Sequence, residues 1–203
     1  MINMPRTCFL EPPREAHDAA QLLSMAVDAH LAGDSAAADH FIRKADNPII
    51  REWTESIWGR NSPHIQATVQ TISQPVAERI AIRMPNAAEK GALHLRDGHH
   101  CRFCGLPVIR AEVRKTIAKA YPNALTWGRT NLSQHAAFQA MWAQYDHLVP
   151  HSRGGDNSAD NMVVTCAPCN FGRMDYLLDE VGLAHPFARE PIRSTWDGLE
   201  RFR

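Results

Sequence analysis

The chain has 203 residues and a formal net charge of zero at pH 7, and 44% of its residues are hydrophobic. This composition is ordinary for a globular protein, no apolar run approaches the length of a membrane span, and the length fits one domain with an appendage or two small domains. No secretory signal is recognisable at the N-terminus, so we expect a cytoplasmic protein without a membrane segment.

Residues 1–90 are predicted to form a helical N-terminal region, whose role the sequence does not reveal. Apolar residues recur at helical spacing in three segments, which are Glu15–Leu31, Ser35–Lys44 and Pro48–Trp58. Ser35 is expected to cap the second helix, and Gly33 and Gly59 are expected to end the first and third.

The apolar stripes of these helices include Trp53 and Trp58, and they suit a core or an interface. A homodimer or a protein partner bound through the N-terminal helices is therefore an expectation. Residues 60–75, with prolines flanking a Thr/Ser/Gln-rich run, are predicted to be a linker or irregular connection.

Two cysteine pairs have the spacing of zinc ligands. Cys101 and Cys104 form the first pair, Cys166 and Cys169 form the second, and Cys8 is left over. Each pair can place two thiolates on one tetrahedral Zn2+. The alternatives are a disulfide framework, which the absence of a secretory signal does not support, and a redox motif, which needs only one pair. We therefore predict one structural zinc with four cysteine ligands, which leaves His99 and His100 exposed.

The segment between the cysteine pairs is predicted to hold two helices. The first covers residues 108–120, and the second is capped by Ser133 and runs through Gln144. Residues 101–145 carry six basic residues and one acidic residue, whereas residues 146–203 have a net charge of −3. The basic run is either a solvated helix face or a surface that binds a polyanion, and the two interpretations carry equal weight.

A strand, a loop, a second strand and a helix are predicted after this segment. The strands are Tyr145–Val149 and Met162–Thr165, with the loop Pro150–Asp160 between them, and the helix covers about Pro168–Val181 and is stopped by Gly182. The second cysteine pair lies at the last junction, so strand, loop, strand and helix would close around one metal.

The motifs of this region occur in a recognisable order. They are R-D-G-x-x-C-x-x-C-G at 96–105, D-H-L-V-P-x-S-R-G-G-D-N at 146–157 and D-N-M-V-V-T-C-x-x-C-N-x-x-R at 160–173. The steps of 14 residues from His147 to Asn161 and of nine from Asn161 to Asn170 fit the same pattern. The sequence closely resembles the HNH endonucleases of the ββα-metal (His-Me finger) class, although the third signature position, often His in that class, is Asn170.

The resemblance covers about residues 94–181 and implies an α+β fold. We expect a helical N-terminal region at 1–90, a small HNH nuclease domain at 91–185 with a helical insertion at about 107–144, and a C-terminal extension at 186–203. Nothing in the resemblance bears on residues 1–90.

The resemblance also implies roles for individual residues. His147 would be the general base of phosphodiester hydrolysis, and Asp146 and Asn170 would hold a catalytic Mg2+ or Mn2+. Asn161 would tie the loop to the first strand and help to orient the base. Basic side chains would contact the nucleic acid, and those we expect to do so are Arg153, Arg173, Arg110, Arg114 and Lys119.

Cleavage of DNA is the expected activity. The alternatives are an RNA-directed nuclease, and a non-catalytic zinc module that binds nucleic acid or a protein. Asp146 next to His147 argues against the non-catalytic module, because pure binding needs no base beside a carboxylate. The residues do not distinguish restriction or antiviral defence from mobile-element biology or repair.

Overall fold

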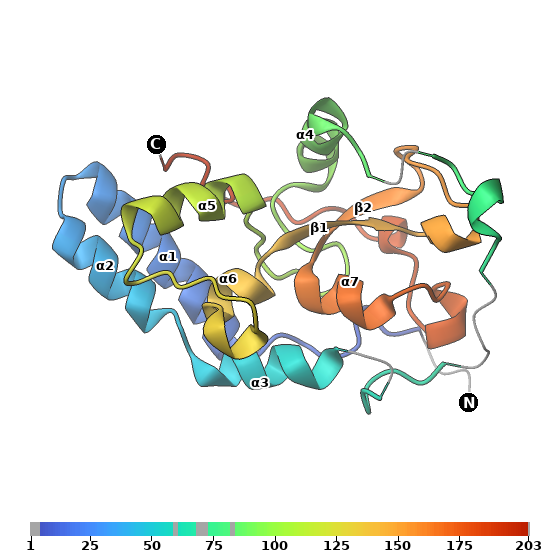
Figure 1. Ribbon diagram of the computed structural model, residues 1–203, viewed down its shortest axis with the longest axis horizontal. Coiled ribbons are helices and arrows are strands. Elements are labelled where there is room, and N and C mark those ends of the chain that lie inside the picture. Colours follow the sequence, from blue (N-terminus) through green and yellow to red (C-terminus); the bar gives the residue numbers. More distant parts are fainter. Residues whose placement is uncertain (1–4, 59–60, 68–72, 82–83, 203) are drawn as a thin grey trace.

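The computed structural model describes residues 5–58, 61–67, 73–81 and 84–202 (Figure 1). It has an α+β fold, as the sequence predicts, in which N-terminal helices precede a small domain built around a two-stranded sheet. In Figure 1 the helices α1 and α2 lie at one end of the molecule, and the sheet and α7 lie towards the other end.

The three predicted N-terminal helices are present. They are α1 (Arg14–Leu31), α2 (Ser35–Lys44) and α3 (Pro48–Ile57). Gly33 follows α1 with φ +83°, as expected, but the cap of α2 is Asp34, whose carboxylate accepts a hydrogen bond from the Ala37 N–H. A carboxylate near a helix N-terminus also meets the positive end of the helix dipole, which favours Asp34 over Ser35. Gly59 lies outside the described residues.

One helix was not predicted. It is α4 (Ala87–Asp97), and it packs on strand β2 (Met162–Cys166). Its local signal is a capping box, in which Asn86 accepts a hydrogen bond from the Glu89 N–H and the Glu89 carboxylate accepts one from the Asn86 N–H. The helix ends at Gly98, whose φ of +74° does not continue the helical conformation. The short 3-10 helix η1 (Val76–Glu78) precedes α4 and directly follows the segment 60–75 that was predicted to be a linker.

The helices of the insertion are shorter than predicted. They are α5 (Ala111–Ala120) and α6 (Ala136–Ala140), with the 3-10 turn η2 (Asn131–Ser133) between them. Helix α5 starts after Ile109 because Ile109 is extended and exchanges backbone hydrogen bonds with Met141 (2.7 Å) and Ala143 (2.9 Å). Ser133 does not cap α6, since it belongs to η2.

The sheet is a hairpin-like pair of antiparallel strands. Strand β1 (Ala143–His147) begins two residues before the predicted strand, and Asp146 pairs with Val163 of β2. Helix α7 (Ala167–Arg173) follows β2 directly and packs on both strands. It ends earlier than predicted, because Met174 has φ +53° and breaks the helical conformation. The 3-10 turns η3 (His151–Arg153), η4 (Asp179–Val181) and η5 (Pro186–Ala188) complete this part of the chain.

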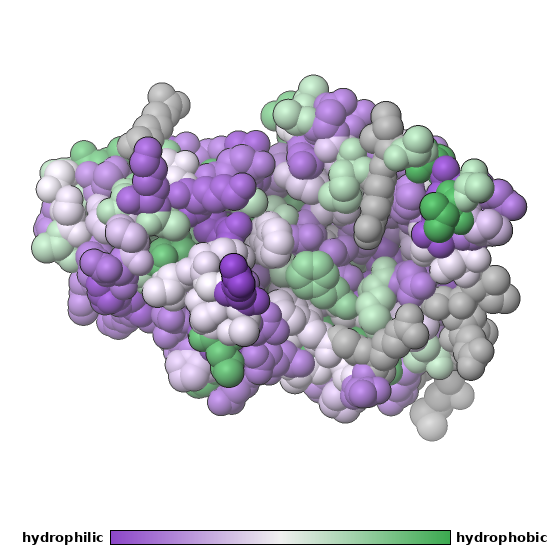
Figure 2. Space-filling model, in the orientation of Figure 1, coloured by the Kyte–Doolittle hydropathy of each residue, from purple (hydrophilic) through white to green (hydrophobic). Residues whose placement is uncertain are grey.

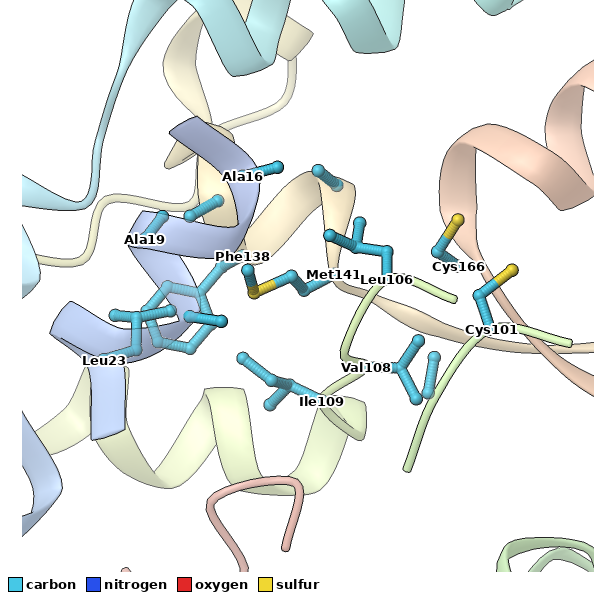
Figure 3. Close-up of a cluster of buried hydrophobic side chains, with 14 of the residues drawn as sticks. Ala16, Ala19, Leu23, Cys101, Leu106, Val108, Ile109, Phe138, Met141 and Cys166 are labelled. Atoms are coloured by element: carbon cyan, nitrogen blue, oxygen red, sulfur yellow. The ribbon is translucent and has the colours of Figure 1, made fainter. Parts of the chain in front are cut away.

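One hydrophobic cluster joins the N-terminal helices to the sheet region. Figure 3 shows side chains of α1 and α6 in the same group as Leu106, Val108 and Ile109, next to Cys101 and Cys166. Helix α3 packs on α6 and α7, and its Trp53 is buried, as expected of a core residue. The N-terminal helices therefore pack against the sheet region and share one hydrophobic core with it.

The C-terminal segment docks on the first cysteine pair. The Arg189 guanidinium donates to the carbonyl oxygens of Arg102 (2.9 Å) and Phe103 (2.8 Å), and the Trp196 indole donates to the Val108 carbonyl oxygen (3.1 Å).

On the face drawn in Figure 2, hydrophobic side chains are scattered among hydrophilic ones. Across the described chain, the helices are too short or too polar to cross a membrane.

Candidate active site and zinc centre

The four paired cysteines meet at one point, as the sequence predicts. Their sulfur atoms all lie within 4.8 Å of one another, and the Cys104 and Cys166 sulfurs are 3.5 Å apart. Four thiolates on a tetrahedral zinc, at about 2.3 Å from the metal, would be separated by about 3.8 Å. The cluster could therefore hold a zinc ion, and the donor set fits that metal.

Local backbone geometry positions the cysteines. In the first pair, the Cys101 N–H donates to the Leu106 carbonyl oxygen and the Gly105 N–H donates to the Cys101 carbonyl oxygen, while Gly105 has φ +77°. In the second pair, Cys166 is the N-cap of α7 and Cys169 lies one turn later. Burial raises the pKa of the Cys166 thiol, so a cation beside it would favour the thiolate form.

Asp97 connects the first cysteine pair to the sheet, a role that the sequence alone did not suggest. Its carboxylate is 1% exposed, accepts two hydrogen bonds from Arg96 at 2.7 Å and accepts another from the Val164 N–H at 2.9 Å. The Arg102 backbone N–H donates to the Val164 carbonyl oxygen, so Asp97 and Arg102 together hold the segment of the first cysteine pair against β2.

The two histidines before Cys101 are not exposed, contrary to the sequence prediction. His100 is buried, and the partly buried His99 stacks on His94, with ring centroids 4.6 Å apart. His94 also hydrogen-bonds to the Tyr145 hydroxyl (3.1 Å), and burial, together with the neighbouring His99, lowers the pKa of His94 to about 4. Packing against α4 and the C-terminal segment covers these rings, an effect that local sequence does not reveal.

A cleft of about 680 Å³ opens beside the end of β1. Asp146, His147 and Asn170 all line it, so three of the predicted catalytic residues share one cavity. Its remaining wall comes from α7, from the loop after β1 and from residues 76, 79–81 and 84, which precede α4. No side-chain hydrogen bond of Asn170 is present within the described chain, so its amide oxygen is available to a ligand.

Arg173 is buried against Asp146. Its Nε donates to Asp146 Oδ2 (2.7 Å), a second nitrogen donates to Oδ1, and its other contacts are the carbonyl oxygens of His147 and Tyr176. Both side chains of this ion pair are almost fully buried. The guanidinium therefore donates into the protein and fixes the Asp146 carboxylate, while the contact between Arg173 and nucleic acid stays a prediction.

His147 is held by a side chain of the loop. Its Nε2 lies 2.8 Å from Asn157 Oδ1. Burial lowers the pKa of His147 below its ordinary value of 6.5, although the Asn157 hydrogen bond and the Asp146 charge act in the opposite direction. A lowered pKa keeps the imidazole neutral near pH 7. Asn157 lies in the D-N motif at 156–157, but the sequence alone suggests no role for it.

Asn161 closes the loop between the two strands. Its Oδ1 accepts a hydrogen bond from the Val149 N–H (2.7 Å), and its Nδ2 donates to the carbonyl oxygens of Val149 (3.1 Å) and Asp156 (2.8 Å). Gly155 allows this closure, because a Cβ there would lie 1.7 Å from the Val149 carbonyl oxygen. These bonds hold the loop that carries Asn157 against the end of β1.

The basic residues of the insertion do not form one surface. Arg114 is buried, with its guanidinium 3.3 Å from the centroid of the Trp127 ring, and burial lowers the pKa of Arg114 to about 10. Arg110 forms an ion pair with Glu200 (2.5 Å), while Lys119 is exposed. None of the three lines the cleft. Arg114 is held elsewhere by stacking on Trp127, and Arg110 by the side-chain carboxylate of Glu200.

Arg153 directly follows residues that line the cleft, but it does not line the cleft itself. Its guanidinium forms an ion pair with Glu180 at 2.5 Å. Glu180 also accepts a hydrogen bond from the Leu177 N–H (2.8 Å). Arg153 therefore joins the loop after β1 to the segment that follows α7.

Comparison with known proteins agrees with the geometry. Residues 135–173 match the sequence model of a family described as HNH endonuclease. The match runs from the residue before α6 through both strands to the end of α7, so this segment is similar to an HNH domain. No match was found among curated proteins or among solved structures. The HNH family implies a nucleic-acid substrate and a divalent metal, and it indicates nuclease activity.

Proposed function

We propose that this protein is a metal-dependent HNH endonuclease that hydrolyses phosphodiester bonds in DNA. The observation that carries the proposal is the shared cleft of Asp146, His147 and Asn170, at the end of β1 and on α7. A hydrolytic site needs a base for the attacking water and positive charge near the scissile phosphate. The three side chains supply the base and the oxygen ligands for a cation.

His147 is the proposed general base. An amide oxygen only accepts hydrogen bonds, so the contact between Nε2 and Asn157 Oδ1 favours the neutral ring with its proton on Nε2. Nδ1 is then left with a lone pair that can take a proton from water. The lowered pKa of His147 supports this role, because the free lone pair persists below neutral pH.

Asp146 and Asn170 are the proposed protein ligands of Mg2+ or Mn2+. An ionised carboxylate has about four lone-pair sites, and Arg173 uses one on each oxygen, so Asp146 retains acceptor capacity towards the cleft. Asn170 adds an amide oxygen, and hard divalent ions prefer such ligands. A bound ion would supply charge that stabilises the scissile phosphate and the leaving oxygen.

The direct test incubates purified full-length protein with supercoiled DNA, linear DNA and RNA, each with Mg2+, Mn2+ or chelator. Cleavage of DNA that requires the divalent ion is the expected result. Cleavage of RNA alone would replace DNA as the substrate. Absence of cleavage with retained nucleic-acid binding would favour a non-catalytic zinc module.

His147→Ala is the variant that excludes a contaminating nuclease. Loss of a positioned base costs on the order of 10²–10⁴ in rate, whereas DNA affinity should change little, because the base acts in the transition state. Wild-type cleavage by this variant would show that another site or another protein is responsible.

A further inference from the structure

The segment before α4 lies against the loop that carries the proposed base. The Gln74 N–H donates to the Ser152 carbonyl oxygen (2.7 Å), and the His151 ring bonds to the Ile80 carbonyl oxygen through Nε2 (2.7 Å). A Cβ at Gly154 would lie 2.7 Å from Gln74 Nε2, so the two segments are in close contact. Residues 73–81 thus form a wall of the cleft although they precede the HNH match by more than fifty residues.

Arg79 is the residue of this wall whose charge has no partner in the described chain. It lines the cleft, and its guanidinium makes one hydrogen bond there, from Nε to the Gln74 carbonyl oxygen (2.9 Å). Among the described residues, the other arginine that lines the cleft is Arg173, which is buried and pairs with Asp146. Arg79 therefore offers two NH2 groups and a positive charge to whatever enters the cleft.

We infer that Arg79 binds a backbone phosphate of the substrate, next to the phosphate that is cleaved. This inference rests on the proposed nuclease function and deepens it, because it adds a substrate contact from outside the HNH match. Guanidinium groups pair with phosphate oxygens through two parallel N–H donors. Charged phosphate contacts position nucleic acid without reading its sequence. Arg79 suits this role, because the hydrogen bond from its Nε to Gln74 holds the guanidinium in place.

The experiment measures DNA binding as a function of salt in a His147→Ala background, so that the substrate stays intact. Arg79→Ala should weaken binding equally for unrelated sequences and lower the log–log salt slope by about 0.9, the value for one phosphate contact on duplex DNA. Arg14→Ala is the matched control, since Arg14 is exposed on α1 and does not line the cleft. It should leave the slope unchanged.

Arg79→Lys separates charge from support of the wall. Lysine keeps the positive charge but lacks the Nε donor to Gln74, so binding with a slope close to that of the parent supports the inference. A slope as low as that of Arg79→Ala would mean that Arg79 acts by shaping the wall, and would overturn it. So would an Arg79→Ala variant that binds with an unchanged slope.

Cleavage and binding assays together separate the role of Arg79 from the nuclease activity itself. If the wild-type chain cleaves DNA and Arg79→Ala binds and cleaves as well as the wild type, only the role of Arg79 is refuted. If the wild-type chain binds DNA but cleaves nothing with any divalent ion, the nuclease proposal fails and the role of Arg79 in cleavage fails with it, whereas the salt slopes still report whether Arg79 contacts phosphate.

Discussion

Asn157 Oδ1 lies 2.8 Å from Nε2 of His147 and so holds the ring of the proposed base from the loop side. Asn161 fixes that same loop to the end of β1 through hydrogen bonds to Val149 and Asp156. The orientation of one imidazole therefore depends on two asparagines that are 10 and 14 residues away in the chain. Asn157 is a positioning residue in this arrangement, since it acts through His147.

Replacing Asn157 with Asp should move the acid limb of the cleavage profile to higher pH. A carboxylate beside the imidazole favours its protonated form, so the pKa of His147 should rise by about one pH unit or more. The base is active when neutral, so at acidic pH a rise of one pH unit in this pKa lowers the rate about tenfold. Measurement of kcat/KM against pH tests this.

Ala159→Asp is the matched control for that variant, because it places a carboxylate on an exposed residue of the same loop. Its acid limb should stay where the wild-type limb lies. An Asn157→Asp profile that coincides with the wild-type profile would show that Asn157 does not act on the base His147.

One zinc per chain should be bound by the four paired cysteines, and folding should require it. Structural zinc binding contributes about 10–16 kcal/mol in small domains, which is comparable to the whole stability of about 5–15 kcal/mol of a native protein. Cys166→Ser should therefore unfold at least the region around the cluster, as seen by circular dichroism and metal analysis. Cys8→Ser, which changes a cysteine outside the cluster, should keep the metal. Well-folded protein without zinc would contradict the prediction.

The proposed oxygen ligands should make cleavage selective for hard cations. Activity should appear with Mg2+ or Mn2+ and be poor with added Zn2+ or Ni2+, because oxygen sites favour the former pair. Asn170→His should extend activity towards Ni2+ if the variant stays active, and Asn170→Ala should raise the Mg2+ concentration that half-maximal cleavage needs. An unaltered Mg2+ requirement in Asn170→Ala would show that Asn170 is not a ligand.

The protein should lose stability as the pH falls below neutral, in part through His94. The pKa of His94 is about 4 in the folded chain, where burial lowers it, and 6.5 in the unfolded chain. Between these values the unfolded chain binds more protons, so the free energy of unfolding rises with pH. Protonation of the unfolded state should therefore remove on the order of 3 kcal/mol between pH 7 and pH 4.

His94→Gln tests that contribution, since an amide can bond to Tyr145 and Gly98 without titrating. Its free energy of unfolding, measured by denaturant between pH 7 and pH 5 with zinc content checked, should fall less steeply than that of the wild type. Parallel curves for the two proteins would assign the pH dependence to other groups.

The sequence by itself determined the cysteine cluster and the two strands, because their signals are local. Two C-x-x-C pairs constrain ligand geometry whatever surrounds them, and His147, Asn161 and Asn170 lie on one continuous strand, loop, strand and helix segment. The helical period of α1 to α3 is likewise a property of neighbouring residues, so those helices were predicted within one or two residues of their ends.

The tertiary structure decided what each charged side chain contacts. Nothing near Arg173 in the chain reveals that it pairs with Asp146, 27 residues earlier, or that Trp127 covers Arg114. Arg79 reaches the cleft only because residues 73–81 dock on the loop after β1. Pairing and burial of charges depend on which distant segments pack together, and a linear pattern of basic residues does not contain that information.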